Sequence, residues 1–172
     1  MAEQRSGFKI GGYFTAECFS PDGVLKWKEV AKNYVTDTGI HAMLEIIFEG
    51  ATQYNHYVSI FKADDSISTA SAVTDIGTAI HEVTTTTDVN GAERPTYVCV
   101  ATNKQVTNSA SKASFVFAAA RTIYGAMLVL KESTFLDAVN GTLTAIAKFT
   151  TAQAVGIGDT LLVTYTIDAA DV

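Results

Sequence analysis

The sequence predicts an all-β fold: an antiparallel β-sandwich, jelly-roll or immunoglobulin-like, with one short α-helix at about residues 37–49. Apolar and polar residues alternate with a period of two between Gly141 and Ile167. Turn-forming residues separate the other short apolar runs, and only the stretch from Asp37 has helical spacing. Such two-faced strands are typical of antiparallel sheets packed over a core. With 172 residues, we expect a single domain at 11–172, preceded by an N-terminal arm or tail at 1–10.

The first expected element is a hairpin from Gly11 to Val30. Its turn, Ser20 to Gly23, has Pro at the second position and Gly at the fourth, as a type I turn favours. On the outgoing strand, Leu25 and Trp27 have the same parity. We therefore expect the tryptophan to be at least half buried, as a core or interface residue rather than a sugar-binding platform.

The helix follows as the next element. Thr36 or Asp37 is expected to cap its first turn, and Gly50 to end it in the left-handed conformation. Its apolar residues recur at intervals of three and four, which places them on one helix face. These residues are Ile40, Met43, Leu44, Ile47 and Phe48. We expect the helix to cover one open end or face of the sandwich.

In the middle of the chain we expect a strand at Tyr54 to Lys62 and a Ser- and Thr-rich loop at Ala63 to Gly77. Two further strands, Ile80 to Thr87 and Thr96 to Thr102, are predicted to be joined by a tight turn at Asn90-Gly91. In the second of these strands, the apolar run from Tyr97 to Val100 indicates burial on both faces.

Ile123 to Leu130 is apolar at both parities. A strand of this kind is either central in a sheet or pressed against a neighbouring subunit. The last two strands each have one apolar and one polar face. The first places Thr142, Thr144, Lys148 and Thr150 on the polar face, and the second runs from Leu161 to Ile167.

Composition limits the possible partners. The chain has 12 Lys plus Arg against 18 Asp plus Glu, for a net charge of −6, which is the opposite of a nucleic-acid binder. It contains no apolar run long enough for a membrane helix. Its mean hydropathy of +0.19 indicates apolar surface that subunit contacts would bury.

The redox state of the cysteines follows from the compartment. Met1 to Lys9 lack the features of a signal peptide, so we expect folding in a cytoplasm. Cys18 and Cys99 are then reduced and are predicted to be small buried apolar side chains.

No catalytic, cofactor-binding or metal-binding motif is visible. His41, His56 and His81 have no metal-ligand spacing, and Asp64-Asp65 lacks the remainder of a calcium loop. Glu17 with Glu29, or Asp75 with Glu82, could pair across strands as glycosidase carboxylates do, although any acidic β-protein offers such pairs. A Ser, His and Asp triad assembled in space stays open at this point. We predict that the protein is not an enzyme and uses no cofactor.

Several segments occur in an order that resembles a known family. They are Trp27 followed by Asn33 to Gly39; Tyr57 to Ile60; Arg94-Pro95; Val106 to Ser109; the Phe115 strand leading to Ile123 to Ala126; and Gly158 to Tyr165. In this order they resemble a family of small structural proteins from the virions of tailed bacteriophages. The chain departs from that family at Val83 to Thr87 and at Lys131 to Asn140.

The resemblance implies a non-enzymatic virion protein, assembled in the cytoplasm of a bacterial host. The expected role is a capsid cement or decoration protein that binds and stabilises the lattice of the major capsid protein at the capsid surface. We expect a homotrimer whose seam draws on Ile123 to Leu130 and on Trp27. The alternative is a tail or fibre component that binds a host glycan, and a third possibility is a β-sandwich hydrolase.

Overall fold

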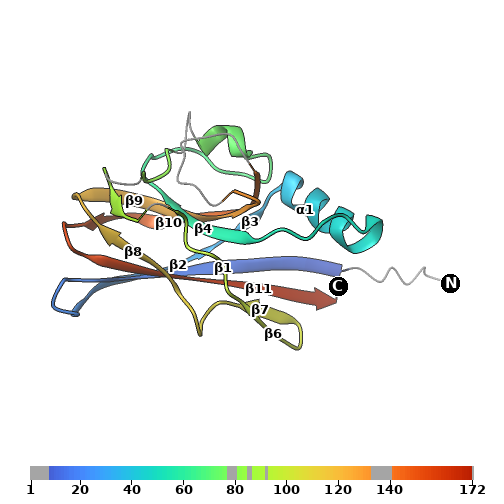
Figure 1. The fold of residues 1–172 in the computed structure, drawn as a ribbon, viewed down its shortest axis with the longest axis horizontal. Coiled ribbons are helices and arrows are strands. Elements are labelled where there is room, and N and C mark those ends of the chain that lie inside the picture. The colour runs from blue at the N-terminus through green and yellow to red at the C-terminus, as the bar shows by residue number, and fades with distance from the viewer. Residues whose placement is uncertain (1–7, 77–80, 85–86, 92, 133–140, 172) are drawn as a thin grey trace.

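Two antiparallel sheets pack face to face in the computed structural model of the chain (Figure 1). The structure describes residues 8–76, 81–84, 87–91, 93–132 and 141–171. It confirms the predicted all-β sandwich with one short helix. The predicted N-terminal arm lies outside these residues up to position 7, and its last residues belong to the first strand, which begins at Phe8.

The larger sheet is built around the last strand, β11. Its order is β2 (Leu25–Lys32), β1 (Phe8–Phe19) and β11 (Thr160–Asp171), followed by β8 (Ala113–Phe117) with β5 (Val89–Asn90), and by β7 (Gln105–Thr107) with β6 (Val100–Thr102). β8 and β7 pair with successive parts of the same edge of β11. The first and last strands of the fold therefore lie side by side over almost their whole length.

The smaller sheet has the order β3 (Tyr34–Val35), β10 (Thr142–Val155), β9 (Arg121–Leu130) and β4 (His56–Phe61). The chain enters it directly from β2 through β3, so the two sheets are joined at the end where the helix α1 (Asp37–Leu44) begins. Figure 1 places α1 towards the end of the sandwich where β1 starts and β11 ends.

The predicted first hairpin is confirmed. The Gly23 N–H donates to the Ser20 carbonyl oxygen at 2.9 Å, and Gly23 has a positive φ of 82°. Trp27 is more than half buried, as predicted. Its indole N–H donates to the Ala154 carbonyl oxygen at 2.9 Å, and its ring meets Phe149 edge-on at 6.3 Å between centroids.

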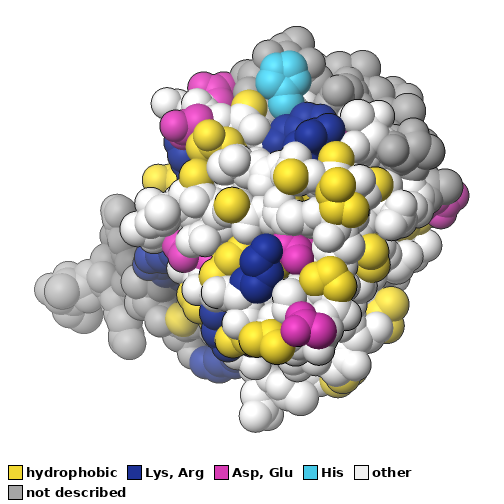
Figure 2. Space-filling model, turned by 90° about the vertical axis from the view of Figure 1, so that its left-hand side faces the viewer, with side chains coloured by type: hydrophobic (Ala, Val, Ile, Leu, Met, Phe, Trp, Pro, Cys, Tyr) yellow, Lys and Arg dark blue, Asp and Glu magenta, His cyan; other side chains and the backbone are white. Residues whose placement is uncertain are grey.

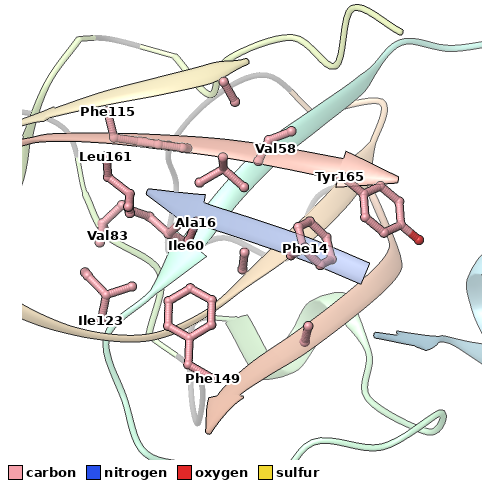
Figure 3. Packing of buried hydrophobic residues seen from close by; sticks show 14 of the residues in the cluster. Phe14, Ala16, Val58, Ile60, Val83, Phe115, Ile123, Phe149, Leu161 and Tyr165 are labelled. Atoms are coloured by element: carbon pink, nitrogen blue, oxygen red, sulfur yellow. The ribbon is translucent and has the colours of Figure 1, made fainter. Parts of the chain in front are cut away.

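Alternate residues of β1 and β11 form the main core between the sheets (Figure 3). Phe14 and Tyr165 stack with 4.2 Å between ring centroids. The buried Tyr165 hydroxyl accepts a hydrogen bond from the Asn33 side-chain amide at 2.7 Å, which satisfies its polar atom. The apolar residues predicted for β11 face this core as expected, but Thr164 and Thr166 of its predicted polar face are buried as well.

The smaller sheet is buried on its outer face as well. A second cluster there joins Phe61, Met127, Val129, Leu143, Ile146 and Ile76, with Ile67 and Val73 packed against it. The predicted polar face of β10 is also wrong at Thr144, which lies at a register irregularity of the strand, is buried, and donates its hydroxyl to the Leu128 carbonyl oxygen at 2.8 Å. The covering residues come from the loop after β4, a long-range contact that a local pattern does not contain.

Burial of β9 inside its own chain corrects one expectation. β9 lies between β10 and β4, and Met127, Val129 and Leu130 are no more than 2% exposed. The sequence predicted that this strand is either central in a sheet or packed against another subunit, and the structure shows the central position. Ile123 to Leu130 therefore cannot supply the seam between subunits, because its side chains are already covered.

The predicted hairpin around Asn90-Gly91 is also wrong. Val89 and Asn90 pair with β8, whereas Val100 to Thr102 pair with β7. Part of the predicted strand Ile80 to Thr87 lies outside the described residues, and Glu82 forms a single bridge to Phe61 on β4. Long-range pairing outweighed the local turn signal here.

Exposure at the β6 edge reverses two further predictions. Val98 and Val100 are both 55% exposed, so the Tyr97 to Val100 run is not buried on both faces. Cys99 between them is exposed as well, contrary to the prediction, while Cys18 is buried as predicted. β6 ends its sheet, which leaves these residues without a covering strand.

Candidate functional site

The helix is fixed to the sandwich at its first turn. Thr36 accepts a hydrogen bond from the Gly39 N–H at 3.0 Å, which confirms the predicted cap. Gly39 is buried, and a side chain there would overlap the backbone of Thr144 on β10. After α1 the chain continues as a π-helical turn, η1 (Glu45–Glu49), and ends at Gly50 with a positive φ of 68°. The predicted bounds of 37–49 are confirmed.

The apolar face of this helix is left open. Ile47 is 66% exposed and Phe48 is 77% exposed, and Ile40 and Leu44 are also exposed. The helix contacts β10 at one end of the sandwich, but it leaves much of this apolar face uncovered. Large apolar side chains gathered in this way, rather than scattered singly, mark a binding surface.

The open face lines a hollow of about 290 Å³, which we call the α1 groove. One wall is the helix, and the other is Ile10 from β1 with Val35 from β3. The residues lining the groove are Ile10, Val35, Ile40, Met43, Leu44, Ile47 and Phe48. All of these side chains are aliphatic, aromatic or thioether, so the groove can bury apolar groups of a partner but offers no acid, base or nucleophile.

A second hollow of about 470 Å³ continues from the α1 groove over β1 and β2 and shares Ile10, Val35 and Ile40 with it. Lys9 and Lys32 line this second hollow, which we call the lysine hollow. The opposite end of the molecule has a different character, because basic, acidic and apolar side chains are interspersed there (Figure 2). Ile157 and Val24 are exposed apolar residues of that opposite end, whereas at the helix end the exposed apolar residues Ile40, Leu44, Ile47 and Phe48 belong to one continuous segment.

The buried charges elsewhere serve to hold the structure together. Asp88 accepts hydrogen bonds from Lys62, Arg121 and the Thr84 N–H. Burial alone would raise the pKa of Asp88, but these donors outweigh it and lower the pKa to about 2. A carboxylate that is permanently ionised and fully paired links three segments of the chain and does not act as an acid or base.

The two carboxylate pairs considered as glycosidase sites are not formed. Glu17 lies opposite Lys28 and pairs with it at 3.0 Å, whereas Glu29 is one register position away and therefore on the other face of the strand. Asp75 accepts from the Ala72 N–H at 2.7 Å, while Glu82 is bound by Arg94. Neither geometry holds two carboxyl groups across a cleft.

The other candidates also have structural partners. His41 is exposed and pairs with Glu45 at 3.4 Å. Asp64 pairs with Lys148, which also donates to the Asp65 carbonyl oxygen at 3.0 Å. Over the described part of the chain, no three potential ligands among His, Cys, Asp and Glu gather where a metal ion would bind. Nor does any helix in that part have the length and apolar character to cross a membrane.

Comparisons with protein-family models, with curated proteins and with solved structures find no match to this chain.

The helical spacing of the apolar residues was the one signal of this site in the sequence. It identified five of the groove residues as one apolar helix face but did not predict that this face is exposed. Ile10, Val35, Lys9 and Lys32 were missed, because strand patterns do not say which residues a helix at the end of a sheet will leave uncovered.

Proposed function

We propose that this protein is a non-enzymatic structural component of a bacteriophage virion, a cement or decoration protein that binds the lattice of the major capsid protein at the capsid surface. The observation that carries the proposal is the α1 groove, an apolar binding surface without catalytic groups. Its position at the helix end of a rigid sandwich suits adhesion to a large partner.

The energetics of the groove fit this role. Fully burying a large aliphatic or aromatic side chain contributes roughly 1.5–3 kcal/mol. Covering Ile47 and Phe48 of each subunit would thus stabilise the state to which the protein binds. A ligand that binds only the assembled lattice shifts the assembly equilibrium towards that lattice by mass action. A symmetric oligomer multiplies the effect through avidity.

The homotrimer stays part of the proposal, with a different seam. β9 is closed inside its own chain, and Trp27 is engaged with Ala154 and Phe149. Val98 and Val100 on the edge strand β6 are exposed apolar residues outside the α1 groove. We propose the β6 edge as the contact between subunits, because an uncovered edge offers both backbone hydrogen bonds and apolar side chains.

A tail or fibre component that binds a host glycan is the second candidate. It would use exposed aromatic rings, of which Tyr13 and Tyr34 line separate hollows and Trp27 is mostly buried. The copy number in purified particles separates the two roles. A cement protein is present in numbers comparable to the major capsid protein, and a fibre in far fewer copies.

Co-sedimentation with expanded empty capsids, made from the major capsid protein of the same genome, tests the proposal. The wild-type chain should saturate the capsids, and Phe48→Asp should lose binding. Val24→Asp is the matched control, because Val24 is also exposed, at 60%, but lies in the turn between β1 and β2. Absence of wild-type binding, or equal loss with both variants, contradicts the proposed role of the groove.

A further inference from the structure

We infer that the partner segment bound in the α1 groove is acidic and amphipathic, with large apolar side chains for the groove and carboxylates for Lys9 and Lys32. The inference rests on the proposed function, since it names the chemistry of the partner that this surface binds. It is carried by the charge state of the lysine hollow and by the continuity of the two hollows.

The two lysines differ from other basic residues of the chain. Within the described residues, the Lys and Arg side chains that pair with a carboxylate include Lys26, Lys28, Lys62, Arg94, Lys112, Arg121 and Lys148, and the Lys131 ammonium lies over the Tyr54 ring. Lys9 and Lys32 are exposed, and no carboxylate within the described residues forms an ion pair with either. In a chain with 18 acidic and 12 basic residues, two cations that line one hollow without a carboxylate partner make a local positive site.

The geometry leaves this site open to a ligand. Gly11 lies between the lysines in the lining of the lysine hollow, and a side chain added there would meet nothing within 4 Å. Among the described residues, none that lines the α1 groove or the lysine hollow is acidic. Asp168 is the register partner of Gly11 on β11 and lines a neighbouring hollow together with both lysines, where its carboxylate accepts a hydrogen bond from the Gln105 side-chain amide at 2.8 Å. Lys9 and Ile10 are consecutive residues of β1 and face opposite sides of the strand, so a segment lying along the shared hollow can present carboxylates to the lysines on one side and apolar side chains to the groove on the other.

Protein carboxylates fit this surface better than other anions. Nucleic acids and anionic membranes present many charges, and a chain with a net charge of −6 is repelled by both beyond the two lysines. Neither of them supplies side chains shaped for a groove about 290 Å³ in volume. An amphipathic protein segment supplies both the apolar groups and the localised charge.

Two synthetic peptides of equal length test the inference by fluorescence anisotropy. Both have Leu and Phe at i, i+3, i+4 and i+7; one has Glu at the polar positions and the other Lys. The Glu peptide should bind the full chain roughly tenfold more tightly at low salt, with a smaller advantage at high salt. Phe48→Asp should weaken both peptides, because it removes the shared apolar contact.

Charge-reversal variants test whether Lys9 and Lys32 cause the preference for the Glu peptide. The double variant Lys9→Glu/Lys32→Glu should bind the Lys peptide more tightly than the Glu peptide. The control, Lys104→Glu/Lys131→Glu, makes the same change in net charge at exposed positions outside both hollows and should keep the wild-type preference. Binding of neither peptide, equal binding of both, or an unchanged preference in Lys9→Glu/Lys32→Glu contradicts the inference.

The two proposals fail separately. A preference for the Glu peptide without capsid binding contradicts the proposed function and leaves the partner chemistry standing. Capsid binding that is unaffected by Lys9→Glu/Lys32→Glu contradicts the partner chemistry alone.

Discussion

Arg94 and Glu82 form a two-pronged ion pair in which both side chains are fully buried. Arg94 Nε lies 2.6 Å from Glu82 Oε1, and Arg94 Nη2 lies 2.6 Å from Glu82 Oε2. The remaining Arg94 nitrogen, Nη1, donates to the Glu132 carbonyl oxygen at 2.9 Å. Glu82 also forms a β-bridge to Phe61 on β4, the edge strand of the smaller sheet. The ion pair therefore holds the segments around Glu82 and Arg94 against that edge.

Removing one partner of this pair should be costly. Arg94→Met leaves the Glu82 carboxylate buried without its cation, and we expect a loss of about 3–5 kcal/mol in the free energy of unfolding in urea. The double variant Glu82→Leu/Arg94→Met removes both charges and should recover much of that loss. A loss below about 1 kcal/mol for Arg94→Met would show that the charge is not buried as described.

Asp88 should make stability fall in acid. Its pKa is about 2 in the folded chain against 3.8 for the free group, so the folded state favours the ionised form. The contribution is present above about pH 4 and is lost as the pH falls towards 2, with a size of about 2 kcal/mol. Urea unfolding across this range checks it. Asp88→Asn should be less stable at neutral pH and should show a smaller fall in acid; an unchanged slope contradicts the assignment.

Gly125 permits a close approach that a larger residue would block. A Cβ at this position of β9 would overlap the Phe61 ring and the Ala147 carbonyl oxygen. Gly125→Ala should therefore lower the free energy of unfolding by about 2 kcal/mol or more. Gly11→Ala is the control, because its Cβ points into open space, and it should change stability by less than about 0.5 kcal/mol. Similar losses for the two variants would argue against this packing.

The two cysteines should react at very different rates. Cys99 is exposed, whereas Cys18 is buried, and burial together with the Asp159 carboxylate raises the pKa of Cys18 to about 11. Mass spectrometry after maleimide treatment of the folded chain should find the label on Cys99, and Cys18 should be labelled only in urea. Rapid labelling of Cys18 in the folded Cys99→Ser variant would contradict its burial.

Local signals in the sequence predicted the parts of the fold that local geometry decides. Four features depend on residues close to one another in the chain: the Ser20 to Gly23 turn, the Thr36 cap, the Gly50 helix end and the inward-facing apolar residues of β11. These features were confirmed. The partner of each short apolar run depends on distant residues, and there the Asn90-Gly91 hairpin was wrong.

The chain does expose several large apolar residues, but the sequence pattern did not predict where they lie. The composition and the apolar strands predicted that a partner subunit would bury the excess apolar surface. Instead the loop after β4 covers the outer face of β9 and β10 through Ile67, Val73 and Ile76, and the uncovered residues lie on the helix. A periodic apolar face looks the same whether it faces a core or a partner, so only the packed structure distinguishes them.

A density map of the intact virus particle tests the central claim, that the apolar face of the helix is the adhesive surface. We predict density for this chain on the capsid, with α1 and η1 against the lattice and Phe48 covered by an apolar, acid-flanked segment of the major capsid protein. A particle without this chain on its capsid, or one in which Ile47 and Phe48 face solvent, would contradict the account.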